Sequence, residues 1–581
     1  MMPLLLLLAL VLSALAPAAA PAAVRPPAKA ATASGYGGSA STVDPYATRA
    51  AIQVLRDGGN AVDAAIAAAG VLGVVEPYSA GIGGGGFMVI RNGRGRVRTI
   101  DGREFAPAAF TDRSFLDPAT GEPIPFAEGV TSGLGVGVPG TLRTWQTALA
   151  RHGTRQLRTL LKPGIRLARE GFVVDETLAE QTEANQERFA DFPATAAIYL
   201  PGGRPLAAGA TLRNPDLGRT YGLIARRGVR KGFYTGAVAE KIVQTVRQPP
   251  VRPGAARIVR PGVMATGDLA AYRAIRRPAA TSAYRGFTIA GMRPPSSGAT
   301  TVGESLNILE AFGDPAGDPT TDLHRYLEAT RLAFADRAAY LGDPAFTPVP
   351  LGCLLSQSFA DERQKLIMPT AAESPVAAGA CPQPGSAPSD AAEGPSTTHL
   401  SVADKRGNVV AYTFTIEQTG GSGSVVPGRG FLLNNELTDF DFTPGKPNSP
   451  AARKRPRSSM SPTIVLNGRR PVLVLGSPGG STIITTVLQI LVNRFERGMS
   501  LPEAIAAPRA SQRNTPSSDA EPAFLAQPEA AALVALGHRF TTIPEIGAAA
   551  GIAFKRGGRQ LAAAEPVRRG GGSAMVVSTR K

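Results

Sequence analysis

The chain has 581 residues, 43% of them hydrophobic, and carries a formal net charge of +17. This length and apolar content exclude a fibrous or disordered protein and are typical of a large globular protein that buries more than one core. The excess of Lys and Arg suits a nucleic-acid partner, but the basic runs at 226–231 and 453–457 lack interleaved aromatic residues. We therefore expect a solvated basic surface and no nucleic-acid partner.

The first residues form a short apolar segment. Leu4 to Leu15 is rich in leucine, and small residues in an A-x-A pattern follow between Ala18 and Ala23. The segment is too short to span a bilayer comfortably, so we expect residues 1–23 to be a signal peptide, although a positive charge before it is missing. A periplasmic or secreted protein is predicted. No later stretch stays apolar for about 18 residues, so no stable membrane span is expected.

Cysteine and histidine are scarce. Cys353 and Cys381 can form a disulfide in an oxidising compartment, but their distance in the fold is not readable from the sequence, so the bridge stays open here. The histidines lack the spacing of zinc ligands, and we expect no metal or cofactor. The four are His152, His324, His399 and His538.

The first half of the chain reads mainly as helices. A helix up to about residue 56, a DGGN break and a second Ala-rich helix are predicted, with Asn60 as the N-cap and Asp63 at position N3. A glycine loop and a two-stranded hairpin turning at Asn92-Gly93 follow. Residues 322–343 form the clearest amphipathic helix of the middle region. Residues 370–396, rich in Pro, Ala, Ser and Gly, resemble a flexible linker.

After this linker the pattern changes to strands. "HLSVAD" and "VVAYTFTI" alternate around "KRGN", which predicts a hairpin. Residues 471–495 read as a buried strand, a glycine turn and a helix. Thr397 and Thr398 therefore stand at the beginning of a strand, directly after a flexible segment.

This placement predicts a specific chemistry for Thr397. A cut between Ser396 and Thr397 would make Thr397 an N-terminal residue, whose hydroxyl is a nucleophile and whose α-amine, with a reference pKa of about 8, is a base. The glycines of "GSPGGS" (476–481) would let backbone N–H groups reach the oxyanion. A plain helix-start turn is the alternative for that motif, and a phosphate loop is disfavoured because its lysine is missing.

The chain resembles the gamma-glutamyltransferase (gamma-glutamyltranspeptidase) family, from about residue 35 to the C-terminus. The joint order of its motifs is specific, and they are "DGGNAVDAA", "GGGGF", "REFAPA", "VPGT", "PPSSG", "ADRAAYLGDP", "TTHLSV", "LLNNELTDF", "RPRSSMSPTIV" and "GSPGGS". The resemblance implies an α/β (α+β) fold, the four-layer αββα sandwich of N-terminal-nucleophile hydrolases. It also implies a precursor that cleaves itself into a large subunit, residues 24–396, and a small catalytic subunit, residues 397–581, which stay together as a heterodimer.

The resemblance also assigns roles to individual residues. Thr397 corresponds to the nucleophile, Thr415 to the threonine that supports it, and Gly479 and Gly480 to the oxyanion hole. The remaining matches bind the amino-acid end of the substrate. Arg103, Ser458 and Ser459 correspond to the groups that hold its α-carboxylate, and Glu436 and Asp439 to the acidic pair that binds its α-ammonium.

The implied reaction is a two-step acyl transfer. Thr397 Oγ attacks the γ-carbonyl of a γ-glutamyl donor, the amine leaves, and the γ-glutamyl ester passes to water or to an amino acid or peptide. Glutathione and glutamine are the expected donors. No metal is needed for these steps.

Two positions depart from many family members. Glu417 stands where many carry an asparagine that contacts the substrate, and a carboxylate accepts hydrogen bonds but does not donate them as an amide does. Between Asp439 and Ser458 the chain is short, whereas many relatives carry a longer lid loop there. The chain therefore resembles the lidless bacterial branch, and we expect an open site that admits bulky donors.

Two other functions remain as alternatives. One is an acylase of the same fold that acts on a dicarboxylic side-chain amide such as a glutaryl cephalosporin. Glu436 and Asp439 disfavour it, because such a donor lacks the positive charge that they would bind. The other is an exported binding protein without activity, which would not need Thr397 or Gly479-Gly480.

Overall fold

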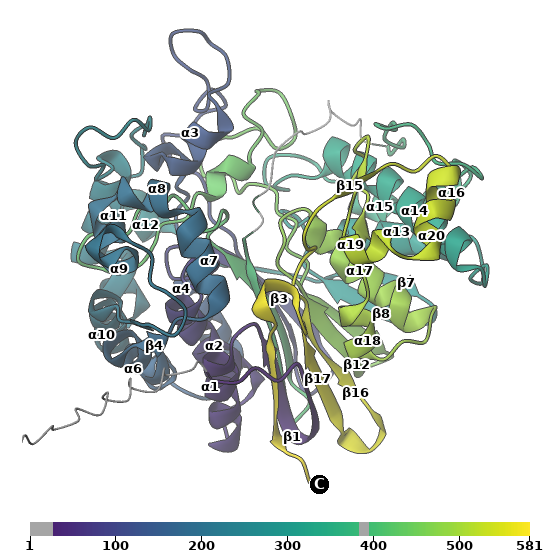
Figure 1. Cartoon of the computed structure of the whole chain (residues 1–581), viewed down its shortest axis with the longest axis horizontal. Coiled ribbons are helices and arrows are strands. Elements are labelled where there is room, and N and C mark those ends of the chain that lie inside the picture. Colours follow the sequence, from purple (N-terminus) through teal and green to yellow (C-terminus); the bar gives the residue numbers. More distant parts are fainter. Residues whose placement is uncertain (1–26, 383–393, 395) are drawn as a thin grey trace, which may run out of the picture.

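Two layers of strands lie between two layers of helices (Figure 1). The computed structural model describes residues 27–382, 394 and 396–581. The long strand β1 (Thr32–Thr42) joins the two sheets: residues 32–35 pair with one sheet and residues 38–41 with the other. The register of its pairing with β18 shifts between Tyr36 and Ser39, where the strand passes from one sheet to the next.

The strands of both sheets are antiparallel. On one side of β1 the order of the first sheet is β9 (Thr398–Asp404), β10 (Val409–Thr415), β2 (Gly85–Arg91), β3 (Val97–Gly102) and β6 (Ile275–Arg277), and β18 (Ser573–Ser578) also pairs with β1. The order of the second sheet is β17 (Gln560–Ala564), β16 (Ala550–Phe554), β12 (Arg470–Gly476), β11 (Thr463–Asn467), β8 (Phe287–Gly291) and β7 (Ala280–Tyr284).

Each sheet has its own helical layer. Helices that cover the first sheet or pack beside it include α1 (Pro45–Arg56), α2 (Ala61–Val75), α4 (Thr141–His152), α6 (Lys162–Glu170), α7 (Glu176–Ala184), α8 (Gln186–Ala190), α10 (Pro215–Val229) and α11 (Ala237–Arg247). Helices on the side of the second sheet include α13 (Gly298–Glu310), α14 (Pro319–Tyr340), α16 (Gln357–Gln364), α17 (Thr482–Phe495), α18 (Leu501–Ala506) and α20 (Pro528–Ala535). The predicted αββα sandwich is confirmed.

Alternation along β9 and β10 builds both cores. Leu400 and Val402 point to the helical layer of the first sheet, where every residue of α2 is buried. Ala403 and Ala411 point the other way and join the core shared with the second sheet. Successive residues of a strand face opposite sides, and here both sides are covered, so every residue of β9 and β10 is buried. The ends of these two strands are therefore fixed positions at which a site can be built.

Several sequence predictions can be compared with these elements. Asn60 and Asp63 form the predicted capping box of α2, and the hairpin of β2 and β3 turns at residues 92–96. The helix expected at 322–343 is α14, but the description as amphipathic is wrong. Most of its residues are buried, because the helix is covered by α13, α20 and the segment that follows α16.

Part of the segment expected to be a linker is anchored. Cys353 and Cys381 form a disulfide, which decides the question that the sequence left open. Tyr340 Oη donates a 2.7 Å hydrogen bond to the carbonyl oxygen of Gly379. Residues 383–393 and 395 of the predicted linker, and the predicted signal peptide at 1–23, lie outside the described residues. Within the described residues, no helix is long and apolar enough to cross a membrane.

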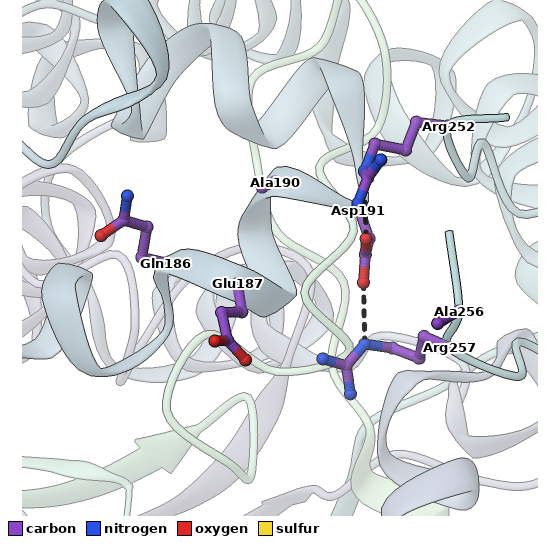
Figure 2. A pocket seen from close by; sticks show the side chains of 7 residues that line it. All are labelled: Gln186, Glu187, Ala190, Asp191, Arg252, Ala256 and Arg257. Carbon is purple, nitrogen blue, oxygen red and sulfur yellow. Dashed lines mark hydrogen bonds and ion pairs between the residues drawn. The ribbon is translucent and has the colours of Figure 1, made fainter. Parts of the chain in front are cut away.

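A surface pocket lies between α8 and the segment 252–257 (Figure 2). Asp191 forms ion pairs there with Arg252 and Arg257, at 3.2 and 3.0 Å. None of the site residues predicted from the sequence lines this pocket.

Candidate functional site

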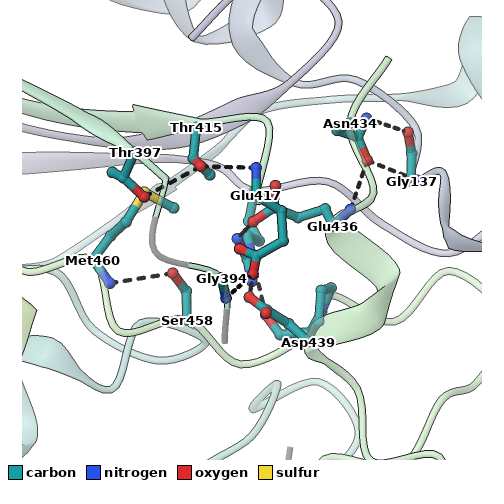
Figure 3. A network of polar contacts seen from close by, with 12 residues as sticks. Gly137, Gly394, Thr397, Thr415, Glu417, Asn434, Glu436, Asp439, Ser458 and Met460 are labelled. Atoms are coloured by element: carbon teal, nitrogen blue, oxygen red, sulfur yellow. Dashed lines mark hydrogen bonds and ion pairs between the residues drawn. The ribbon is translucent and has the colours of Figure 1, made fainter. Parts of the chain in front are cut away.

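Thr397 directly precedes the central strand β9, and its hydroxyl faces that of Thr415 at the end of β10 (Figure 3). Thr397 Oγ contacts the carbonyl oxygen of Ser396 and lies 3.2 Å from the hydroxyl of Thr415. Thr415, the last residue of β10, is also 3.3 Å from the same Ser396 carbonyl oxygen. All three residues are buried. The structure therefore brings together the predicted nucleophile, its supporting threonine and the predicted cleavage site.

Groups on both sides hold the Ser396–Thr397 bond. Ser396 Oγ donates to the carbonyl oxygen of Tyr78 at 2.9 Å and lies 3.1 Å from Ser79 Oγ. Arg569 Nη1 donates to the carbonyl oxygen of Thr397 at 2.8 Å, and Arg569 Nη2 donates to Ser79 Oγ at 2.7 Å. The bond between Ser396 and Thr397 is therefore fixed by contacts with Tyr78 and Ser79, which follow α2, and with Arg569 near the C-terminus.

The glycine turn at 476–481 ends β12 and begins α17. Gly479 and Gly480 have φ values of +132° and +56°, which side-chain-bearing residues rarely adopt. A Cβ atom on Gly479 would lie 2.6 Å from Thr482 Oγ1. Within the described part of the chain, the N–H groups of both glycines donate to no acceptor. A pair of free donors at the N-terminal end of a helix suits an oxyanion.

Three buried carboxylates gather around one buried guanidinium. Glu417, Glu436 and Asp439 each place an oxygen within 4.8 Å of the others. Arg103 forms ion pairs with Glu436 and Asp439, and its own side chain is completely buried. Groups expected to bind the α-carboxylate and the α-ammonium of a substrate are thus in contact. This is consistent with a ligand that carries both charges on one carbon atom.

The charge balance of this cluster favours a further cation. Burial, followed by the charge of Asp439, raises the pKa of Glu417 well above its usual value of 4.5, and Arg103 only partly opposes this effect. Burial alone would lower the pKa of Arg103, but the neighbouring carboxylates of Asp439, Glu104 and Glu417 outweigh burial and raise that pKa. Because Arg103 faces more acidic groups than its single charge can neutralise, a bound ammonium group would favour the ionised forms of these carboxylates.

The predicted serine pair adjoins this cluster. Arg103 donates to the carbonyl oxygens of Pro456 and Arg457 at 3.1 and 2.9 Å, and these residues directly precede Ser458 and Ser459. The amide of Ser458 donates to Pro295 of the "PPSSG" motif, and Ser297 donates back to the Ser458 carbonyl. The distant motifs at 294–298 and 455–465 therefore meet at one place.

Several residues of the site are not singled out by the sequence prediction. Arg337 donates to Ser459 Oγ at 2.8 Å. Asn434 accepts the amide hydrogens of Gly137 and Glu436, which orients the acidic segment (Figure 3). Asn434 lies inside "LLNNELTDF" and Arg337 inside "ADRAAYLGDP", so the motifs carried a signal for both. Arg569 lies outside every quoted motif.

His399 of "TTH" is a core residue. Its Nδ1 lies 2.7 Å from Thr413 Oγ1 and its Nε2 lies 3.0 Å from Ser401 Oγ. Burial lowers the pKa of His399 to about 3, so the imidazole is neutral near pH 7. Because both ring nitrogens have partners, His399 offers no free base to Thr397.

The short segment between Asp439 and Ser458 is folded against neighbouring residues. Phe442 stacks on Phe115 with ring centroids 4.0 Å apart, and Lys454 Nζ donates to the carbonyl oxygens of Pro447 and Ser449. The stacking on Phe115 joins the segment to the rest of the protein, and the Lys454 hydrogen bonds hold it together internally.

Comparison with known proteins decides the family. The family model for gamma-glutamyltranspeptidase matches residues 47–575. The chain belongs to the gamma-glutamyltranspeptidase family. It is an enzyme of that class, as the sequence predicts, and the match includes the site residues described above.

Named relatives of this family member include two kinds of enzyme. The glutathione hydrolase proenzyme of Bacillus subtilis (strain 168) is 42% identical over 522 residues, covering 88% of this chain and 86% of the relative. The acylase ACY 1 proenzyme of Pseudomonas sp. (strain SE83) is 36% identical over 541 residues, covering 92% of each chain. Among solved structures, the cephalosporin acylase from Bacillus halodurans superposes with a TM-score of 0.83 at 27% identity, covering 96% of this chain and 99% of that one.

Proposed function

We propose that this gamma-glutamyltranspeptidase family member cleaves its own chain between Ser396 and Thr397. The observation that carries the proposal is the contact of Thr397 Oγ with the carbonyl group of Ser396. Thr415 Oγ1 lies beside this contact, and Arg569 donates a hydrogen bond to the carbonyl oxygen of Thr397. Cleavage gives a large subunit of residues 24–396 and a small subunit of residues 397–581. They remain a heterodimer, because β1 of the large subunit stays paired with β9, β17 and β18 of the small one.

The cleavage is an acyl shift followed by hydrolysis. Thr397 Oγ attacks the carbonyl carbon of Ser396, the C–N bond breaks, and the proton of the hydroxyl passes to the amine that is released. Water then hydrolyses the resulting ester. The products are the carboxylate of Ser396 and an N-terminal Thr397 whose hydroxyl and α-amine are both free.

In the mature enzyme the same threonine attacks a γ-glutamyl donor, with glutathione and glutamine as the donors we infer. Its α-amine takes the hydroxyl proton, and the N–H groups of Gly479 and Gly480 bind the oxyanion. The amine leaves with that proton, and a γ-glutamyl ester of Thr397 remains. Water, or the amine of an amino acid or peptide, then attacks the ester and restores the hydroxyl.

The cluster around Arg103 selects the donor. Glu436 and Asp439 bind the α-ammonium, and Glu417 adds negative charge beside them. Arg103, with Ser458 and Ser459, binds the α-carboxylate, for which a guanidinium is suited by its forked N–H groups. When a donor enters, Arg103 exchanges part of its contact with the acidic pair for the carboxylate of the ligand.

An acylase of the same fold is the second candidate, because acylases are among the relatives. The two functions are separated by p-nitroaniline release from γ-glutamyl p-nitroanilide and from glutaryl p-nitroanilide, which differ only in the α-ammonium. We expect the γ-glutamyl compound to react about 10 to 100 times faster, the value of a charge-assisted hydrogen bond in a buried site. Glu436→Gln should reduce the ratio of the two rates, because it removes one of the carboxylates that bind the α-ammonium. Equal or faster release from the glutaryl compound would favour the acylase.

We infer that the enzyme is exported. The apolar segment at 4–15 has the features of a signal peptide, and the disulfide between Cys353 and Cys381 suits an oxidising compartment such as the periplasm. Fractionation of the producing cells tests this inference, and recovery of the full-length precursor in the cytoplasm alone would contradict it.

A further inference from the structure

The side chain of Arg569 reaches Thr397 from a turn with a left-handed backbone. Arg569, Gly570 and Gly571 have φ values of +53°, +69° and +75°. Glycine adopts such values readily, whereas an arginine does so rarely and needs surroundings that hold it there. The turn sets the direction in which the Arg569 side chain leaves the backbone. The hydrogen bond from Arg569 to the carbonyl oxygen of Thr397 therefore depends on the groups that fix this turn.

Lys29, from the opposite end of the chain, is one of these groups. Its Nζ atom donates to the carbonyl oxygens of Gly570 and Gly571, each at 3.1 Å. The same atom lies 3.0 Å from Asp175 Oδ2. An ammonium group has three N–H donors, and here three oxygen atoms lie within hydrogen-bonding distance of it. The side chains of Lys29 and Asp175 are only 20% and 21% exposed, so water competes little for these contacts.

Asp175 is itself held in place at the beginning of α7. Its Oδ1 atom accepts the amide hydrogen of Leu178 at 2.9 Å, which makes it the N-cap of that helix. The turn also packs tightly on the first residues of α7, because a Cβ atom on Gly570 would lie 2.3 Å from Thr177 Oγ1. The ion pair therefore joins the ammonium group of Lys29 to a fixed helix end.

The backbone beside Lys29 is fixed as well. The carbonyl oxygen of Ala30 accepts the amide hydrogen of Ala574 at 2.7 Å, and that of Ala31 accepts the amide hydrogen of Ala564 at 2.8 Å. Both donors belong to strands after residue 397. Lys29 therefore starts from an anchored stretch of chain and can hold the turn in one position.

Other contacts secure the beginning of the turn without Lys29. The backbone amide of Arg569 donates to Glu545 Oε2 at 2.8 Å, and the side chain of Arg568 pairs with Glu521. Lys29 holds the two carbonyl groups that follow Arg569. Loss of its ammonium group should therefore loosen the second half of the turn and leave the fold around it intact.

We propose that Lys29 is a positioning residue for the reaction at Thr397, because it holds the turn that keeps Arg569 on the carbonyl oxygen of Thr397. The inference rests on the proposed function and extends it to the N-terminal segment of the large subunit. Lys29 precedes the predicted cut and Arg569 follows it, so the contact joins the two subunits. It persists after cleavage, when Thr397 is the N-terminal nucleophile and its carbonyl group still needs a fixed place.

The first test replaces the ammonium group and then restores it. Lys29→Met keeps the length of the side chain and should slow both self-cleavage and p-nitroaniline release from γ-glutamyl p-nitroanilide by about threefold to tenfold, the value of one hydrogen bond. KM for the donor should change little, because the cluster around Arg103 is untouched. Lys29→Arg should recover most of both rates. A pocket of about 710 Å³, lined by Lys29, Asp175 and Gly570 among others, leaves room for the larger side chain.

A double variant shows whether Lys29 acts through Arg569. In an Arg569→Gln protein, the addition of Lys29→Met should cause no further loss of either rate, because the arginine to be positioned is absent. Rate losses that multiply in the double variant would overturn the proposal, and so would unchanged rates in Lys29→Met alone. A lysine that serves only the stability of the fold would give multiplied losses.

Two more variants complete the experiment. Asp175→Asn keeps a residue that caps α7 but removes the ion pair, and it should produce a smaller loss of both rates than Lys29→Met. It replaces Lys29→Met in the double variant if that protein does not fold. Lys365→Met removes a surface lysine that pairs with Glu362 on α16 and should leave both rates unchanged. Absence of cleavage and of p-nitroaniline release in the unmodified protein would instead overturn the proposed function.

Discussion

Arg569 donates a hydrogen bond of 2.8 Å to the carbonyl oxygen of Thr397, across 172 residues of sequence. Its other terminal nitrogen donates to Ser79, which also lies 3.1 Å from the side chain of Ser396. The arginine therefore bridges the two sides of the bond that we expect to be cut.

Arg569→Gln should slow self-cleavage by about 10-fold or more, because loss of charge-assisted hydrogen bonds loosens the bond relative to the Thr397 hydroxyl. The rate is measured from the disappearance of the uncut chain on denaturing gels after synthesis. Arg556→Gln, on the exposed turn between β16 and β17, is the matched control and should mature normally. Unchanged cleavage of Arg569→Gln would show that the contact does not position the bond.

Thr415→Val should slow both cleavage and turnover by about 10 to 100 times. The substitution keeps the β-branched shape in the middle of a sheet but removes the hydroxyl that lies 3.2 Å from Thr397 Oγ. Thr415→Ser retains the hydroxyl and should recover most of both rates. Full activity of the valine variant, measured as p-nitroaniline release, would exclude a supporting role.

The pH dependence of donor binding should reflect Glu417. Burial and the nearby charge of Asp439 raise its pKa, so the group takes up a proton at a higher pH than an ordinary glutamate. The α-ammonium of a donor favours the ionised form, so KM should rise as the pH falls through the raised pKa. Glu417→Gln has no proton to take up at this position and should flatten this part of the profile. The same rise in KM for both proteins would assign the pH effect to another group.

The disulfide should stabilise the fold without serving the chemistry. Its cysteines are 28 residues apart, and replacing both with serine should lower the free energy of unfolding by about 2–4 kcal/mol. The double variant should still cleave itself, because Cys353 and Cys381 pack against a separate apolar cluster that includes Tyr340, Leu354 and Phe359. Denaturant unfolding measures the difference, and addition of reductant to the unmodified protein should produce a similar loss. Identical unfolding curves would contradict this prediction.

Local patterns predicted the elements that carry the site. Alternation around residues 399–416 is enough to predict β9 and β10, and the glycines before 482–495 mark the turn into α17. The capping box of α2 was readable in the same way, because its partners are only three residues apart. In each case the residues whose interactions decide the structure lie close together in the sequence.

The rest depends on contacts between distant segments. No local sequence pattern predicts the hydrogen bond from Arg569 to Thr397 or the one from Arg337 to Ser459, because each joins residues more than 100 positions apart. The sequence pattern of α14 suggested a helix with one exposed face, but neighbouring helices cover it. The sequence also did not decide whether Cys353 and Cys381 form a disulfide, because only the fold brings the two cysteines together.

The central claim is that Thr397 becomes an N-terminal nucleophile by cutting the chain before itself. The most direct measurement is the mass of the purified protein and of its fragments, with N-terminal sequencing of the smaller one, beside a Thr397→Ala variant. We expect the unmodified protein to consist of two fragments, the smaller beginning at Thr397, and the variant to remain one uncut chain that releases no p-nitroaniline from γ-glutamyl p-nitroanilide. An unmodified protein that is active while uncut, or a variant that is cut at the same bond, would contradict the account.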